Sequence, residues 1–382
     1  MRLWPLRGRR PRVSPPSEDL LVTEELLRQS VEDVFVARER RSGSGIIAFR
    51  GELRVEPSRA LDVLIARLRP YGFTPFLAAE GDAVVLQAWP IAATVERPRF
   101  ALNLVLFLLT CASTLVAGAF FSGSPTFDAL ARSPGIARFL TGVPFAFTLL
   151  AILGVHEFGH YFTARHYGAS VSLPYFIPAP PPIFLFGTLG AIIRMRSPAK
   201  DRNSLFDIAA AGPLAGLAVA IPAIVLGLTW STVVPAPPGG YIGFGQSLLM
   251  RFLVQIRFGE IPPDMILYTH PMADAAWAGF LVTALNLFPV GQLDGGRIAY
   301  ALFGRRHRLV GAITLGLLTL MGLVTGSLNW FVWAGLIFFL VGVHHAPPLD
   351  DLTPLSRGRR VVGFACLVLL VLLIPPVPIE LG

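Results

Sequence analysis

The chain has little charge, one lysine and two cysteines. Charged residues make up only 15% of its 382 residues, whereas a soluble domain usually carries about 25%, so an ordinary soluble protein is excluded. Lys200 is the one lysine, and the arginines behind the net charge of +8 flank apolar blocks instead of lining one face, which argues against nucleic-acid binding. Cys111 and Cys366 both lie inside apolar blocks, so no disulfide framework is expected.

What the chain does have is apolar sequence in long blocks, with 53% hydrophobic residues and a mean hydropathy of +0.62. About 20 apolar residues span a bilayer as a helix. The fold class we predict is a polytopic α-helical membrane protein with six or seven transmembrane helices and a small α+β domain at the N-terminus. The expected spans are Phe100–Phe121, Phe139 to about Tyr167, Phe206–Val233, Met272 to about Val290, Leu309–Gly326, Leu328–Val343 and Val361–Ile374.

The first hundred residues differ in composition from the rest. Residues 1–17 form a basic, proline-rich tail that we expect to be disordered, and the lack of an apolar stretch after it argues against a cleavable signal peptide. Residues 18–95 indicate a small soluble α+β domain. "SGIIAFRGELRV" alternates like a strand, "SRALDVLIARLRPYG" has helical periodicity, and "FTPFLAAEGDAVVLQAWP" suggests two strands around a turn.

One apolar stretch, Leu173–Met195, cannot be a helix. It holds five prolines between Pro174 and Pro182, ahead of an alternating apolar run. Proline removes backbone donors, and irregular backbone persists in a membrane only where protein or a water-filled cavity satisfies it. The pattern predicts a re-entrant loop and β-hairpin that line an internal cavity.

Arginine placement predicts the orientation. The three most basic loops are Arg194–Arg202, Gly304–Arg308 and Ser356–Arg360, and the positive-inside rule places all three in the cytoplasm. On this basis we expect a multi-pass protein of the bacterial inner membrane, with its N-terminal domain and active site toward the cytoplasm.

Ionisable residues stand inside the second expected span. His156-Glu157-Phe158-Gly159-His160 fits the H-E-x-x-H pattern, which brings two imidazoles to one helix face, where they can bind one Zn²⁺ with the glutamate beside them as general base. Ionisable residues within membrane spans are rare and usually functional.

A hydrolytic zinc site needs a third protein ligand, and Asp294 is the candidate. It follows Pro289 and Gly291, which break the fourth expected span, and it precedes Gly295 and Gly296, which allow close backbone approach. The predicted topology places Asp294 at the depth of the histidines. A role as helix N-cap is the alternative, and capping would not exclude ligation.

At these residues the chain resembles the site-2 protease family of intramembrane zinc metalloproteases. The family's H-E-x-x-H corresponds to His156–His160, and its N-x-x-P-x-x-x-L-D-G pattern corresponds to Asn286, Pro289, Leu293, Asp294 and Gly295. "FDIAAAGPLAG" (Phe206–Gly216) and the Gly-Thr-Leu-Gly-Ala run are also typical of it. The resemblance implies a protease core over residues 100–348, one zinc ion per chain, His156, His160 and Asp294 as ligands, and Glu157 as catalytic base.

The resemblance also implies a transmembrane protein as substrate and the lipid bilayer as surroundings. Asn286, Gly187 and Gly190 are the candidate substrate-binding residues. The chain lacks room for a PDZ domain between the core helices and has no CBS-like domain, so it is similar to the PDZ-free branch that includes chloroplast and many bacterial members. Residues 349–382 are expected to form a cytoplasmic loop and one more transmembrane helix.

Two other functional classes stay open at this point. A metal transporter or channel also places histidine and aspartate inside a membrane, but it needs no general base such as Glu157. A catalytically silent relative that acts as a chaperone or scaffold would be expected to lack one of the four site residues.

Overall fold

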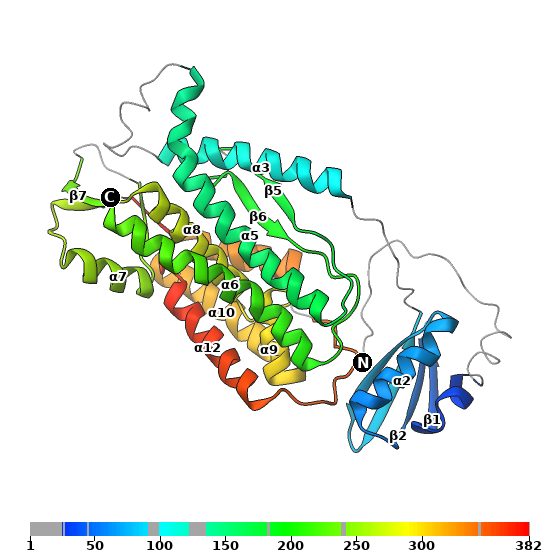
Figure 1. Ribbon diagram of the computed structural model, residues 1–382. Coiled ribbons are helices and arrows are strands. Elements are labelled where there is room, and N and C mark those ends of the chain that lie inside the picture. Colours follow the sequence, from blue (N-terminus) through cyan, green and yellow to red (C-terminus); the bar gives the residue numbers. More distant parts are fainter. Residues whose placement is uncertain are drawn as a thin grey trace. The chain divides into compact units, whose positions relative to one another are not determined.

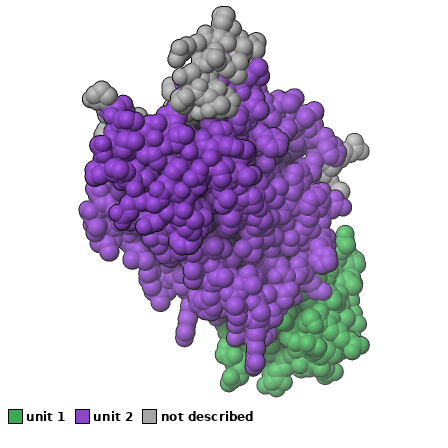
Figure 2. Space-filling view, turned by 60° about the vertical axis from the view of Figure 1, so that its left-hand side comes forward, with its two compact units in different colours: residues 1–94, 348–353 green, residues 95–347, 354–382 purple. Residues whose placement is uncertain are grey.

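The computed structural model describes residues 25–381 except 26, 44–45, 91–98, 122–134, 182–183, 238–241 and 343–344. The basic tail expected at residues 1–17 therefore lies outside the described residues. The chain divides into two compact units (Figure 2), the first made of residues 1–94 and 348–353 and the second of residues 95–347 and 354–382.

The first unit contains a four-stranded antiparallel sheet and a helix packed on it; the sequence pattern predicts that helix and three of the strands, but not the first strand. The strands lie in the order β1-β2-β4-β3. Leu61, Leu64 and Leu68 of the helix are buried in the core that the sheet shares with it. The elements are β1 (Phe35–Gly43), β2 (Ile46–Leu53), α2 (Pro57–Leu68), η1 (Arg69–Tyr71), β3 (Thr74–Glu80) and β4 (Ala83–Trp89).

The second unit is mostly helical, and its long helices are shown in Figure 1. The helical elements of this unit, long and short, are α3 (Phe100–Phe121), η3 (Gly135–Gly142), α5 (Val143–His166), α6 (Arg202–Thr229), α7 (Leu248–Phe258), α8 (Pro271–Asn286), α9 (Asp294–Phe303), η4 (Gly304–Arg306), α10 (His307–Thr325), α11 (Leu328–Leu336), η5 (Ile337–Val341) and α12 (Arg357–Leu373).

Four helical segments among the described residues are long and apolar enough to cross a membrane. They are Phe100–Phe120, Arg138–His166, Arg202–Thr229 and Asp294–Thr325, and the apolar helix Leu328–Phe339 is shorter. The expected six or seven spans are thus not confirmed, because α8 and α12 have only 16 and 17 residues. The basic Gly304–Arg308 is not a loop; it includes the short turn η4, which lies within the fourth segment.

Three helices form the interior of this unit. Helix α5 packs against both α6 and α8, and α6 also packs against α8 and α9. Within the most apolar window, 50% of residues are buried in the α5 segment and 56% in α6, compared with 22% in α3. The interior helices are therefore the ones that can enclose a site, while α3 presents most of its apolar surface outward.

Short strands complete the second unit. β5 (Tyr175–Pro178) and β6 (Thr188–Ile192) form the hairpin expected from the proline-rich stretch, and β5 lies along α3 while β6 contacts α5 (Figure 1). On the segment after α6, β7 (Thr232–Pro235) pairs with β9 (Met265–Tyr268), and β8 (Ile242–Phe244) pairs with β10 (Ile379–Leu381) after α12.

Candidate metal centre

The two histidines of the H-E-x-x-H pattern lie on the inner face of α5. Residues four apart share a helix face, and that face packs against α6 and α8. His156 is 3% exposed, His160 is 4% exposed and Glu157 is 6% exposed. Three ionisable side chains are therefore enclosed by the most interior helices of the unit.

Asp294 joins them as the first residue of α9. The chain turns between α8 and α9 with Gly291 at a φ of 56°, and Gly295 and Gly296 let the backbone close on itself. A Cβ on Gly295 would lie 1.9 Å from the carbonyl oxygen of Leu287, and one on Gly296 would lie 2.4 Å from that of Gly291. At these glycines the close approach is to the backbone of the turn itself. The N-cap position belongs to Leu293, so Asp294 is not the cap residue.

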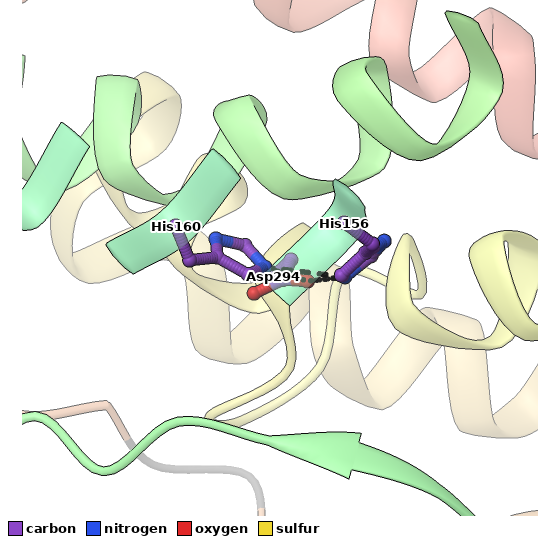
Figure 3. A group of neighbouring side chains, drawn as sticks. All are labelled: His156, His160 and Asp294. Carbon is purple, nitrogen blue, oxygen red and sulfur yellow. Dashed lines mark hydrogen bonds and ion pairs between the residues drawn. The ribbon is translucent and has the colours of Figure 1, made fainter. Parts of the chain in front are cut away.

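The three donor atoms converge on one point, with the imidazoles from α5 and the carboxylate from α9 directed toward one another (Figure 3). His160 Nε2 lies 3.2 Å from His156 Nε2 and 3.1 Å from Asp294 Oδ2, and His156 Nε2 lies 3.5 Å from the same oxygen. Ligands about 2.0–2.2 Å from a tetrahedral zinc are separated by about 3.3 Å. The spacing and the donor set therefore fit a zinc ion held by two imidazoles and one carboxylate.

The ring of His160 is fixed by a main-chain group of α6. Its Nδ1 lies 2.6 Å from the carbonyl oxygen of Ile208. A carbonyl only accepts, so Nδ1 carries the proton and Nε2 keeps its lone pair for the metal. On the other side, the amide nitrogen of Asn286, at the end of α8, is 3.4 Å from His156 Nε2.

Glycines of α6 make room for the two rings. A Cβ on Gly212 would lie 2.1 Å from His160 Nε2, and one on Gly216 would lie 3.2 Å from His156 Cβ. On the facing helix, a Cβ on Gly159 would lie 2.8 Å from the carbonyl oxygen of Ala211. The small residues of "FDIAAAGPLAG" therefore allow α6 to pack closely on α5.

The hairpin passes beside Glu157. The backbone N–H of Ile193, directly after β6, bonds to the Glu157 carboxylate. Gly187 is buried against α3, where its carbonyl accepts from Ser113 Oγ at 2.6 Å and from the N–H of Ala179 at 3.1 Å. Gly190 has a φ of 97°, and its N–H is held by Thr188 Oγ1 at 3.0 Å. Gly187 thus supports the hairpin, and Gly190 lies on the strand next to the site.

Sequence reasoning missed two groups at this centre, the carbonyl of Ile208 and the N–H of Ile193. Both are main-chain groups, so the identity of their side chains carries no signal. Only the neighbourhood of Ile208 in "FDIAAAGPLAG" could have drawn attention to it, as a motif that packs on the histidine helix.

Comparison with known proteins agrees with the geometry. Residues 144–329, which contain both histidines and Asp294, match the model of peptidase family M50. The rice (Oryza sativa subsp. indica) protein named probable zinc metalloprotease EGY2, chloroplastic, is 28% identical over 98% of this chain and 70% of its own length. The Arabidopsis thaliana EGY2 protein is 28% identical over 93% of this chain and 65% of its own length. Arabidopsis EGY1, also named a probable zinc metalloprotease, is 33% identical over 63% of this chain and 44% of its own length. No solved structure matches the chain.

With two imidazoles and a carboxylate spaced for one zinc ion, and relatives named for that metal, the chain is a zinc metalloprotease. It belongs to peptidase family M50, the site-2 protease family.

The expected bacterial inner membrane is wrong. The matching EGY1 and EGY2 proteins are plant proteins named as chloroplastic, which contradicts the expectation of a bacterial membrane. Arginine placement reports on which side of a membrane a loop lies, and it carries no information about which membrane that is.

Proposed function

We propose that this protease is an intramembrane zinc endopeptidase that hydrolyses peptide bonds within, or at the border of, transmembrane helices of membrane proteins. The observation that carries the proposal is the depth of the site. His156 stands 13 residues after Val143 and 10 before His166 in a helix of 24 residues, or about 20 Å and 15 Å from its two ends. A segment of that length and apolarity is long enough to cross a bilayer, which supports a site inside the membrane thickness.

We assign His156, His160 and Asp294 as the metal ligands and Glu157 as the general base. A zinc ion held by these residues would lower the pKa of a bound water toward about 7 and would polarise the carbonyl to be cleaved. Glu157 lies on the same helix, next to His156, and its carboxylate is oriented by the N–H of Ile193. From that position Glu157 takes the proton of the attacking water and returns it to the amine that leaves.

A substrate helix must unwind before its carbonyls can be attacked, because they are engaged in internal hydrogen bonds. We propose that the unwound segment adds as a strand beside β6, the hairpin strand that leads to Ile193. Leu189 and Ile192 on this strand are 58% and 55% exposed, which suits contact with apolar substrate side chains. Gly190 lies in this strand, and Gly187 shapes the turn before it. Asn286, beside His156, is placed to donate to the substrate carbonyl.

We also propose that more segments cross the membrane than the four long ones. The strand β10 after α12 pairs with β8 after α6, and both helices begin at basic segments, so α12 runs in the same direction as α6. Its 17 residues span about 26 Å. The seven proposed crossings are α3, α5, α6, α8 continued by α9, α10, α11 continued by η5, and α12. Cysteines at positions 251 and 376 should then react with an impermeant reagent from one side, and a cysteine at position 357 from the other.

The decisive experiment compares the wild type with Glu157→Gln in detergent. This change keeps the shape of the side chain and removes the base. Bound zinc is quantified in both, and each is incubated with a panel of single-span membrane proteins, with Asp294→Ala as the variant expected to lose zinc. Equal zinc in wild type and Glu157→Gln, with cleavage only by the wild type, supports the proposal. Cleavage by Glu157→Gln at the wild-type rate would refute the role of Glu157.

The same substrate panel, together with a zinc-transport assay on protein reconstituted in vesicles, separates the two other classes. A metal transporter would move zinc across vesicles without cleaving any member of the panel. A silent relative would bind zinc and cleave nothing, even with unwound or helix-destabilised substrates. The gathering of all three donors within 4.8 Å of one another favours the protease, because an ion pathway spreads its ligands along the membrane normal.

A further inference from the structure

The segment between η5 and α12 completes the sheet of the first unit. The N–H of Leu77, on the outer strand β3, donates to the carbonyl of Leu349 at 2.7 Å, and the N–H of Asp351 donates to the carbonyl of Leu77 at 3.0 Å. Asp350 pairs with Leu77 as a parallel bridge. Residues 348–353, which we call the edge segment, thus pair alongside β3 although they lie far from it in the sequence.

Side chains fix the edge segment in this register. Leu349 is 9% exposed and belongs to the core formed by α2 and the sheet. Asp350 is 1% exposed, and its carboxylate accepts from the N–H groups of Leu352 at 2.8 Å and Thr353 at 3.1 Å. The hydroxyl of Thr353 donates to the same carboxylate at 2.5 Å. The turn that ends the edge segment is therefore part of the same bonded structure.

Directly after this turn the chain enters the second unit, where its side chains and backbone form hydrogen bonds with α6. The N–H of Ser356 donates to Asn203 Oδ1 at 3.0 Å, at the start of α6. In the first turn of α12, Arg359 makes a bidentate ion pair with Asp207, with Nε–Oδ1 2.7 Å and Nη2–Oδ2 2.6 Å. Tyr167, the residue that follows α5, donates its hydroxyl to Asp207 and lies 3.3 Å from the Arg359 guanidinium.

This cluster of Arg359, Asp207 and Tyr167 ties together the helices that hold His160. Asp207 directly precedes Ile208, whose carbonyl orients the His160 ring. Tyr167 stands seven residues after His160, at the end of the helix that carries it. The relative position of α5 and α6 sets the bond between His160 and Ile208, and the cluster joins those two helices to α12.

We propose that Arg359 and Asp207 are positioning residues for His160, and that the N-terminal domain controls them by holding the edge segment. The proposal deepens the function proposed above, since it rests on His160 as a metal ligand. The domain acts through the covalent path from Thr353 to Arg359. A docked edge segment keeps Arg359 on Asp207, and its release lets α12 and α6 drift apart and disturbs the bond from His160 to Ile208.

The first test releases the edge segment with Leu349→Glu in the full chain. The matched control is Ala346→Glu, which adds the same charge at an exposed position three residues earlier. Hydrogen exchange measured by mass spectrometry should show loss of protection over residues 74–80 and 348–353 in Leu349→Glu alone, with β2 and β4 protected in both. Zinc affinity, measured by competition with a chelator, should fall about tenfold in Leu349→Glu, at the low end of the loss seen when a ligand's supporting contact is removed.

The second test uncouples the edge segment from α12 without touching either contact. Four residues, Gly-Ser-Gly-Ser, are inserted between Thr353 and Pro354. Protection over residues 74–80 should stay at the wild-type level, while zinc affinity should fall as far as in Leu349→Glu. In assays with saturating zinc, kcat should fall and KM should stay unchanged, because the metal ligand is affected and the substrate strand is not.

The third test asks whether both contacts act on one path. Arg359→Gln should weaken zinc binding about tenfold, and Arg359→Lys should restore part of the affinity because it keeps the charge and loses the two-pronged geometry. The double variant Leu349→Glu with Arg359→Gln should bind zinc no more weakly than Arg359→Gln alone. A merely structural anchor would give losses that add.

Several results would overturn the proposal. One such result is that Leu349→Glu loses protection but keeps the zinc affinity and kcat of Ala346→Glu. The N-terminal domain would then bind the edge segment without any effect on the metal site. Additive losses in the double variant would place the two contacts on separate paths. These failures differ from failure of the proposed function, in which the wild type itself would show no zinc-dependent cleavage that Glu157→Gln abolishes.

Discussion

Replacing Gly212 by alanine should abolish tight zinc binding, because the new methyl group would occupy the space of a metal ligand. A Cβ at Gly212 lies 2.1 Å from Nε2 of His160 and 2.5 Å from the two neighbouring ring carbons. Ordinary contacts between such atoms begin at about 3.5 Å, so the imidazole has to retreat by more than about 1 Å. Zinc sites accept deviations of about 0.2 Å in ligand distance. The displacement is several times larger, and His160 is lost as a ligand.

The expected fall in zinc affinity is at least about 100-fold, the upper end of the range for changes that only disturb a ligand's support. The helix itself should tolerate the change, because alanine is a better helix former than glycine by up to about 1 kcal/mol. Overpacking against His160 works in the other direction and costs about 1–3 kcal/mol. Apo Gly212→Ala should therefore remain folded in detergent, with a small change in melting temperature.

Two other glycines on the facing helices provide matched controls. In Gly216→Ala the Cβ would lie 3.2 Å from His156 Cβ and 3.3 Å from its Nδ1, which a shift of a few tenths of an ångström relieves, so the loss of zinc affinity should stay below about tenfold. In Gly154→Ala the nearest atom is 4.0 Å away, and affinity should not change. Equal zinc affinity in Gly212→Ala and Gly154→Ala, measured by chelator competition, would refute the placement of His160 against α6.

Three further predictions concern the loop after α8, the hairpin and α7. Gly295→Ala would put a Cβ 1.9 Å from the Leu287 carbonyl oxygen, so Asp294 should move and zinc binding should be lost. The control Gly358→Ala meets nothing within 4 Å and should bind zinc normally. Zinc retention by Gly295→Ala would contradict the loop geometry. Gly187→Ala combines a φ of 73° with a contact of 2.3 Å to the Ser113 carbonyl oxygen, so cleavage should fall while bound zinc stays near the wild-type amount, and unchanged cleavage would count against a role for the hairpin. Helix α7 buries Met250 and Val254 and leaves Phe252 61% and Ile256 69% exposed, so we expect α7 to lie along the membrane surface with Phe252 toward the lipid. The fluorescence of a tryptophan at position 252 should then be quenched by brominated lipids more strongly than that of a tryptophan at position 255. Equal quenching at the two positions would argue against this placement.

The metal centre could be predicted to a large extent from the sequence. The four-residue spacing of His156 and His160 fixes them on one helix face, whatever the tertiary structure. Asp294 required one more step, the counting of membrane crossings, which brought it to the same depth as the histidines. The hairpin was indicated by prolines that no helix could accommodate.

Other features depend on packing that no local pattern encodes. The clearance at Gly212 is set by the distance between α5 and α6, and the bond from Ile208 to His160 involves a carbonyl that every residue possesses. The strand β1 was missed because its exposed stretch of charged residues hides the alternation. The edge segment was missed because six residues, interrupted by a turn, show no periodicity, and their partner β3 lies about 270 residues earlier in the chain.

That separation also sets an order of events during synthesis. Residue 77 leaves the ribosome about 270 residues before residue 350, which at about 5–20 residues per second takes roughly a quarter of a minute to a minute. During this interval β3 has no neighbour on its outer side, and an unpaired strand of this kind invites pairing with other chains. A nascent chain of this protein therefore needs its outer strand β3 shielded until the membrane segments have been made. The edge segment can pair with β3 only after nearly the whole chain has been synthesised, so completion of the sheet coincides with completion of the chain.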